Sequence, residues 1–412
     1  MSISMLLLQM AVVLVVARAV GWLFRRFHQP RVIGEMLAGI LLGPSVLGWL
    51  WPSASAAIFA PNSLGGLNAL SQIGLLIFMF LVGLEFDPQM IRGRAHVAVI
   101  TSHVSIIVPF CLGAGLAIYL YPQVSGGNVP LLHFVLFMAI AMSITAFPVL
   151  ARILSESGLL GTPVGSVAIA CAAVDDATAW CILAGVVFLV SVANAALPFW
   201  LTLGGTLIYV GALLFIVRPL TPRFVDLYRE RGALTQDILA LALILMLLSA
   251  WITESLGIHA LFGAFLFGAV MPKDRDFVHA FTGKLEDLTV VLLLPLFFAY
   301  TGLRTNIGLL SGGTLWFDCL LIIAVAVLGK LGGAALSAHA FGMSWREAGA
   351  IGVLMNTRGL IELVALNIGL DIGVLTPTVF TMMVLMALTT TFMTTPLLDL
   401  IYPTAFRHVD LA

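Results

Sequence analysis

Charged residues are scarce in this chain. Asp, Glu, Lys and Arg make up 9% of its 412 residues, whereas hydrophobic residues make up 61%. A soluble globular domain carries about 25% charged residues. The composition therefore excludes a soluble protein and predicts a polytopic membrane protein in a lipid bilayer. The chain also has no basic tract, so no nucleic-acid partner is expected.

Cysteine is equally scarce. Cys111, Cys171, Cys181 and Cys319 each stand alone in an apolar segment, with no CxxC pair and no ligand-like spacing. This pattern favours apolar packing over a disulfide or a resident metal site. No cofactor and no enzymatic activity are expected.

Long polar stretches are missing from both ends. The first apolar segment lacks a preceding positive region and a small-residue cleavage site, which predicts a retained helix rather than a signal peptide. Only eleven residues follow Ile401. We therefore expect one transmembrane domain over residues 1–412 and no soluble regulatory domain.

Apolar segments dominate the rest of the chain. A helix needs about 20 apolar residues to cross the hydrocarbon layer. Hydropathy predicts an all-α protein with about thirteen transmembrane helices, at residues 5–24, 32–50, 67–86, 96–121, 130–153, 163–192, 199–219, 234–254, 257–272, 286–303, 314–341, 346–368 and 374–401.

The basic residues are confined to alternate loops. One set of loops holds fifteen of the nineteen Lys and Arg, the opposite set holds only Arg304, and Arg18, Lys330 and Arg358 fall within spans. Basic loops lie on the cytoplasmic side of a membrane. The distribution predicts a multi-pass protein of the cell membrane with its N-terminus outside and its C-terminus in the cytoplasm.

A weak internal repeat relates the two halves. The second and ninth segments are both glycine-spaced and end in proline, at Pro44 and Pro272. The fifth and twelfth are both interrupted mid-membrane, at 143–148 and 356–359. We therefore expect two inverted repeats of six helices, approximately 1–193 and 234–402. Paired broken helices of this kind indicate the midplane site of a transporter.

Asp175 and Asp176 lie inside the apolar stretch 164–192. Placing one charge at that depth costs about 3 kcal/mol on insertion scales, and such residues mark ion or proton pathways. Neighbouring helical residues point about 100° apart, so the two carboxylates should have different roles. A buried carboxylate also lets a proton and a cation compete for the same oxygen atoms.

Other polar residues at mid-membrane extend this candidate site. Lys330 is the only lysine inside a span; it either needs a buried counter-ion or extends to the membrane surface. At the first break, the hydroxyl groups of Ser143 and Thr145, together with freed carbonyls, would complete an oxygen shell for a cation. Thr145 is equally suited to cap the following half-helix.

The second break carries its own polar group. Arg358 and Glu362 are four residues apart, a spacing that allows an ion pair within one helix. The pair has either a structural role or a part in the proton or cation path. Asn356 and Thr357 lie at the break itself and are accessory candidates.

Six separated motifs carry a family resemblance. They are PRVIGEMLAGILLGPSVLG (30–48), FMFLVGLEFDP (78–88), SITAFPVLARIL (143–154), AVDDATAW (173–180), LPLFFAYTGLRTNI (294–307) and NTRGLIELVALNIG (356–369). Together they resemble the membrane domain of the monovalent cation:proton antiporter superfamily. Within it, they are most similar to the branch of plant cation/proton exchangers, fungal potassium/proton antiporters and bacterial potassium-efflux antiporters.

The resemblance implies a fold and an assignment of residues. The fold is a homodimer in which each protomer has a dimerisation domain and a mobile core domain, and two broken helices cross beside the ion-binding aspartate. The resemblance makes Asp176 the residue that binds the monovalent cation or the proton. It makes Asp175 the partner of Lys330.

The residues favour an antiporter that exchanges K⁺ or Na⁺ for protons by alternating access over three other classes. An intramembrane aspartyl protease needs carboxylates from separate helices and a GxGD motif, which does not follow this pair. A channel-like efflux pathway needs a continuous lined pore, and no TVGYG filter is present. An organic-anion symporter on a similar fold would use small polar residues. The cation and the stoichiometry stay open, because selectivity depends on cavity shape and field strength.

The loop charges make a prediction about topology. A reporter fused after Arg407 should be cytoplasmic and one inserted between Ser53 and Asn62 should be external, because the basic loops stay inside. Protease or thiol-labelling accessibility in intact cells measures both. Two reporters on the same side of the membrane would contradict a chain with thirteen spans.

Overall fold

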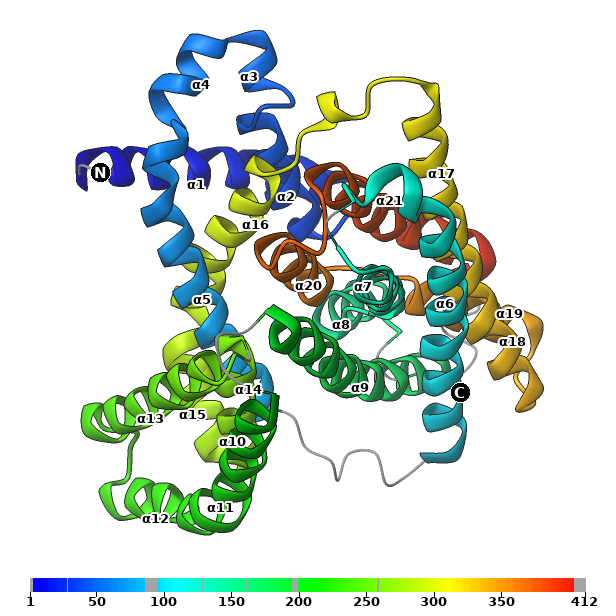
Figure 1. The fold of residues 1–412 in the computed structure, drawn as a ribbon. Coiled ribbons are helices and arrows are strands. Elements are labelled where there is room, and N and C mark those ends of the chain that lie inside the picture. Colours follow the sequence, from blue (N-terminus) through cyan, green and yellow to red (C-terminus); the bar gives the residue numbers. More distant parts are fainter. Residues whose placement is uncertain are drawn as a thin grey trace. The chain divides into compact units, whose positions relative to one another are not determined.

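The computed structural model describes residues 3–27, 29–85, 95–127, 129–159, 162–194, 199–257 and 259–403. All regular elements in these ranges are helices (Figure 1), as the composition predicts. The chain forms two compact units and passes between them five times, three of them within helices. Those helices are α1 (Ile3–Arg26), α9 (Pro163–Asn194) and α16 (Leu294–Leu303).

Unit 1 comprises Met1–Met10, Pro61–Gln89 and Ala184–Phe297. Apolar stretches fold here as helices because a helix satisfies its own backbone groups without water. Besides its parts of the three shared helices, unit 1 contains η1 (Pro61–Ser63), α5 (Leu64–Glu85), α10 (Phe199–Ala212), η3 (Leu213–Val217), α11 (Arg218–Leu220), α12 (Pro222–Arg231), α13 (Gln236–Ser255), α14 (Ala260–Val270), α15 (Arg275–Leu288) and η4 (Thr289–Leu293).

Unit 2 comprises Ala11–Ala60, Met90–Leu183 and Phe298–Ala412, and it holds both predicted broken helices. Its own elements are α2 (Arg31–Leu42), α3 (Leu47–Leu50), α4 (Pro52–Ile58), α6 (Ala95–Val124), α7 (Leu131–Ser143), α8 (Phe147–Glu156), η5 (Ile307–Leu309), α17 (Gly313–Val327), η6 (Leu328–Gly332), α18 (Gly333–Ala340), α19 (Trp345–Met355), α20 (Leu360–Asp371) and α21 (Pro377–Ile401).

Each of the thirteen predicted segments contains a helix, but they are not all alike. Among the described residues, eleven helical stretches are long and apolar enough to cross a membrane, and α19 with α20 forms a twelfth that is bent by 41°. The ninth segment supplies only α14, with 11 residues, or about 16 Å of helix. That is about half the hydrocarbon thickness, so the count of thirteen spans stays a prediction.

Some parts of the predicted topology lie outside the described residues. These are Phe86 and residue 258 within predicted spans, and three of the basic loop residues, Arg92, Arg94 and Arg407. The sidedness of the termini, the inverted repeat and the division into core and dimerisation domains also stay predictions.

Glycine allows close helix contact in both units. In unit 1, α14 packs on α5, and a Cβ at Gly268 would lie 2.2 Å from the Phe80 carbonyl oxygen. In unit 2, a Cβ at Gly39 of α2 would lie 2.3 Å from the Ala299 carbonyl oxygen of α16, and one at Gly302 would lie 2.6 Å from Gly39. Small residues let membrane helices approach at this distance. The second and ninth segments, which the sequence pairs as repeats, thus both use a glycine for such a contact.

The two breaks have local causes and meet each other. Pro148, in the first turn of α8, has no N–H, and its ring would clash with the carbonyl of Ile144 in a continuous helix, so α7 ends at Ser143. At the second break, a Cβ on Gly359 would lie 2.7 Å from Val149 Cγ2. The Ala146 N–H of the first break donates to the Thr357 carbonyl of the second, 3.0 Å away. The structure thus contains two broken helices in contact, as predicted.

The glycine contacts predict a difference between two kinds of Gly→Ala substitution. Gly268→Ala and Gly302→Ala should each destabilise the protein by about 1–3 kcal/mol, because the added methyl group meets backbone atoms. Gly204→Ala is the control, because no atom lies within 4 Å of a Cβ at that position of α10. It should be neutral or slightly stabilising. Thermal unfolding of the purified protein measures all three, and equal melting temperatures would contradict the role of the glycines.

Candidate functional site

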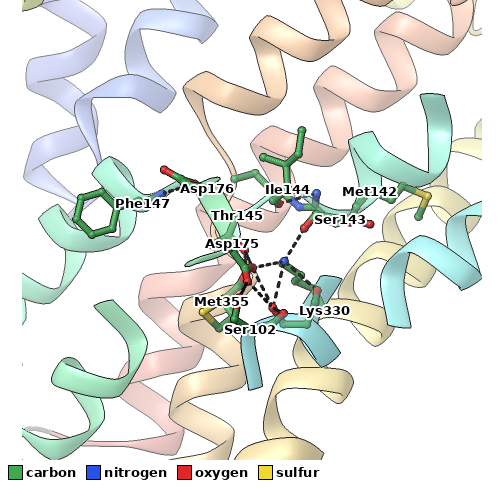
Figure 2. Close-up of polar contacts among 12 residues, drawn as sticks. Ser102, Met142, Ser143, Ile144, Thr145, Phe147, Asp175, Asp176, Lys330 and Met355 are labelled. Carbon is green, nitrogen blue, oxygen red and sulfur yellow. Dashed lines mark hydrogen bonds and ion pairs between the residues drawn. The ribbon is translucent and has the colours of Figure 1, made fainter. Parts of the chain in front are cut away.

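Asp175 and Asp176 project from α9 into different surroundings. Asp175 is 0% exposed and Asp176 is 7% exposed. Figure 2 shows Asp176 turned towards Phe147, and Asp175 turned towards Thr145 and Lys330. The separation follows from the helical geometry, which rotates neighbouring side chains by about 100°. The two carboxylates therefore do not share one site.

Four side chains donate hydrogen bonds to Asp175. Its Oδ2 accepts from Thr145 Oγ1 at 2.7 Å, from Ser105 Oγ at 2.9 Å and from Lys330 Nζ at 2.8 Å. Its Oδ1 accepts from the hydroxyl of Ser102. An ionised carboxylate can only accept hydrogen bonds, and this one is saturated with donors. These contacts hold its side chain in place.

Lys330 has an acceptor for each of its three protons. Nζ donates to Asp175 Oδ2 at 2.8 Å, to the Ser105 carbonyl at 2.9 Å and to the Ser143 carbonyl at 2.6 Å. Lys330 is 0% exposed, so it does not extend to the membrane surface. It lies in the wide helical turn η6, where Gly329 brings the backbone close to Pro109 of α6. The Asp175–Lys330 pair that the family resemblance implies is therefore present.

Asp176 has far fewer partners. Its Oδ1 accepts a hydrogen bond from the Phe147 N–H at 3.4 Å, at the start of α8. The residue before α8 is Ala146, whose methyl side chain cannot cap the helix. The N-terminus of a helix carries a partial positive charge and binds anions. Asp176 therefore faces the N-terminus of the half-helix α8 and makes this one hydrogen bond among the described residues.

The hydroxyl groups at the first break do not surround Asp176. Thr145 Oγ1 donates to Asp175, and its other contact is the Met355 carbonyl at 3.3 Å, so it does not cap α8. Ser143 Oγ donates back to the Ala139 carbonyl in its own helix at 2.7 Å. Neither hydroxyl therefore bonds Asp176 in this conformation. The oxygen shell stays a prediction, because a hydroxyl that donates its proton still has lone pairs for a cation.

Arg358 binds the carboxyl end of α7. Nη1 donates to the carbonyls of Ala141 at 2.9 Å and Ile144 at 3.0 Å, and Nη2 donates to Met142 at 2.6 Å. Nη1 also lies 3.4 Å from Glu362 Oε2, and both side chains are 0% exposed. A cation at a helix C-terminus stabilises the helix dipole. This geometry favours a structural role for the pair.

Lys330 and Arg358 together occupy four consecutive carbonyls, those of residues 141–144. These are groups that the break in α7 frees, and the two side chains supply them with hydrogen-bond donors. Other buried polar atoms of the second break have no partner among the described residues, namely Asn356 Oδ1, Thr357 Oγ1 and Glu362 Oε1. Asn356 and Thr357 therefore stay accessory candidates.

Comparison with known proteins shows the family of the chain. The profile of the transmembrane sodium/hydrogen exchanger family matches residues 11–400. The chain belongs to this family. It is 44% identical to the Na⁺/H⁺ antiporter NhaS4 of Synechocystis over 98% of both chains. It is 40% identical to cation/H⁺ antiporter 17 of Arabidopsis thaliana over 97% of this chain, and 34% identical to K⁺/H⁺ antiporter 1 of Saccharomyces cerevisiae over 98% of this chain.

The coverage of these relatives differs. The chain spans nearly all of the Synechocystis protein, but 49% of the Arabidopsis relative and 47% of the yeast relative. The exchanger fold also resembles a solved structure, that of the sodium proton antiporter MjNhaP1 from Methanocaldococcus jannaschii. The TM-score is 0.66 at 15% identity, covering 99% of this chain and 100% of the other. This likeness shows a common fold.

Three polar residues of this exchanger were missed by sequence reasoning. Ser102 and Ser105 contact Asp175, and both belong to the cluster Thr101-Ser102-His103-Val104-Ser105 inside an apolar span. A spacing of three residues places them on one helix face, and that signal was available. Asp318 is also fully buried in α17, and neither of its carboxylate oxygens has a partner among the described residues.

The contacts of Lys330 predict a pattern of stability. Lys330→Met should destabilise the exchanger by about 3–5 kcal/mol, because it leaves the charge of Asp175 buried and unpaired. Adding Asp175→Asn removes that charge and should restore most of the loss. A double-mutant cycle of thermal unfolding in detergent measures the coupling. Additive effects of the two substitutions would show that the pair does not stabilise the fold.

Proposed function

We propose that this protein is a secondary active antiporter that exchanges K⁺ or Na⁺ for protons across the cell membrane by alternating access. Membership of the sodium/hydrogen exchanger family supports this, as do the names of its relatives, which are Na⁺/H⁺, cation/H⁺ and K⁺/H⁺ antiporters. The observation that carries the proposal is the state of Asp176. It is a buried carboxylate with one long hydrogen bond among the described residues.

Asp176 is chemically suited to bind either ligand. A proton on one oxygen or a cation on both would compensate its charge, and the two ligands exclude each other because they need the same atoms. Asp175 is poorly suited to that task, because Ser102, Ser105, Thr145 and Lys330 already donate to it. We therefore assign the transported cation and proton to Asp176.

Coupling follows from a single shared site. An uncompensated charge at mid-membrane is costly, so the site changes its exposure from one side to the other only when a proton or a cation occupies Asp176. To return, the site must again bind a proton or a cation on the opposite side. Net transport of the proton therefore drives transport of the cation, and the reverse. The protein needs no cofactor for this reaction.

The working form is a homodimer in the cell membrane, with the N-terminus outside and the C-terminus in the cytoplasm. The resemblance to the antiporter superfamily supports the dimer, and the distribution of Lys and Arg supports the orientation. The relatives' names include both sodium and potassium, so both cations belong in every transport assay.

Competition between the proton and the cation at Asp176 predicts how exchange depends on pH. Below the pKa of the binding carboxylate, the apparent affinity for the cation should fall about tenfold per pH unit, because protons occupy more of the sites. At high pH protons become too scarce to drive the return step, so the exchange rate should trace a bell against pH. A pH-sensitive dye in proteoliposomes measures the rate with Na⁺ and with K⁺ at several concentrations.

Two buried aspartates supply the variant and its control. Asp176→Asn should abolish exchange, since an amide can neither release a proton nor bind a cation by charge. Asp318→Asn, which changes a buried carboxylate outside the site, should leave exchange intact. An apparent cation affinity that does not change with pH would contradict a site shared by the cation and the proton. Cation flux without proton flux would favour a channel-like pathway.

A further inference from the structure

Arg304 is the one basic residue in the set of loops opposite the basic ones, and the exchange at Asp176 gives it no role. It directly follows α16, a helix that begins in unit 1 and ends in unit 2. Its side chain is 21% exposed. A residue that hydropathy assigns to a loop is therefore largely buried in unit 2.

The guanidinium group of Arg304 binds the C-terminal end of α20. Nη2 donates to Asp371 Oδ1 at 2.6 Å, and Nη1 donates to Asn367 Oδ1 at 3.0 Å. Asp371 is the last residue of α20, and Asn367, four residues earlier, lies on the same helix face. A planar guanidinium can bind both acceptors at once, which the single nitrogen of a lysine does less well. The two bonds fix both the position and the rotation of this end of α20.

Further contacts hold the same group in place. The guanidinium carbon of Arg304 lies 5.5 Å from the centre of the Tyr300 ring and 5.9 Å from that of the Phe380 ring, within the range of cation–π attraction. The Asn367 amide donates to Thr301 Oγ1 of α16 at 2.8 Å. An isolated ion pair that is partly exposed contributes little, whereas a network of several contacts holds its members in one geometry. The end of α16 is thus joined firmly to the end of α20.

The other end of α20 reaches the surroundings of Asp176. The helix has 12 residues, or about 18 Å of length. Just before it, the Thr357 carbonyl accepts the Ala146 N–H at 3.0 Å. The next N–H along the chain, that of Phe147, donates to Asp176. A contiguous series of contacts therefore leads from Arg304 through α20 to the carboxylate.

We propose that Arg304 is a positioning residue for cation binding at Asp176, and that it acts by fixing the Asp371 end of α20. Without Arg304, α20 is free to shift along α16. Such a shift moves the Thr357 carbonyl away from the start of α8, so the Phe147 N–H no longer faces Asp176 in the same orientation. This inference rests on the proposed function, because it concerns the affinity of that same site.

Transport kinetics separate positioning from stability. In proteoliposomes, Arg304→Gln should raise the apparent KM for both Na⁺ and K⁺ by about two- to thirtyfold, the range typical of substitutions that act through a connecting network. Arg304→Lys keeps the charge but not the two-pronged donor, so it should give a smaller rise. A residue that only stabilises the fold would lower the number of active molecules, and hence the maximal rate, without changing KM.

A double-mutant cycle and a matched control complete the experiment. Asp371→Asn combined with Arg304→Gln should raise KM no further than Arg304→Gln alone, because both substitutions break the same contact. Arg231→Gln is the control, because it breaks an exposed ion pair with Asp237 in unit 1, at 2.9 Å. The control should leave KM unchanged.

The outcomes are distinguishable. A KM that is unchanged in the Arg304 variants overturns the proposal, whatever their maximal rate. Effects of the Arg304 and Asp371 substitutions that simply multiply also overturn it. If Arg304→Gln does not fold, the KM of Arg304→Lys decides between a rise and no change. No exchange by the unaltered protein would instead contradict the proposed function.

Discussion

The need to satisfy backbone carbonyls away from water governs the structure around the site. A membrane helix that breaks at mid-depth exposes polar groups that lipid cannot satisfy. In α7 those groups are the carbonyls of residues 141–144, and the side chains of Lys330 and Arg358 bind all four. These two positively charged side chains in turn need counter-ions, which Asp175 and Glu362 supply. One broken helix thus accounts for four buried charges.

This network separates the two aspartates of α9. Asp175 belongs to the structure that holds the broken helix, whereas Asp176 faces the start of α8 and makes one hydrogen bond among the described residues. A site that binds two competing ligands needs a carboxylate whose partners can change. Under the proposed function, Asp175 is the fixed carboxylate and Asp176 the exchangeable one. Neighbouring helical positions allow this difference because their side chains point in different directions.

Sequence reasoning predicted a candidate site and one of its pairs, Asp175 with Lys330, but not its other contacts. Polar residues inside apolar stretches pointed to Asp175, Asp176 and Lys330, because ionisable residues at that depth are costly. The sequence does not show which acceptor a hydroxyl group bonds. Thr145 contacts Asp175, and Ser143 donates to its own helix, because each hydroxyl bonds the acceptor that packing brings nearest. Ser102 and Ser105 lie about 70 residues from Asp175 in the chain, and only the packing of α6 against its neighbours brings them together.

Composition and periodicity determined by themselves that this chain is an all-helical membrane protein, that two of its helices are interrupted, and which ionisable residues lie within the spans. Those properties depend on local sequence, because hydropathy and proline act on the residues around them. The tertiary structure decided which charges pair, which carbonyls they bind and which aspartate has fewer partners. It also showed α14 to be only 11 residues long. These depend on distances between segments far apart in the chain, and close packing at residues such as Gly359 sets those distances.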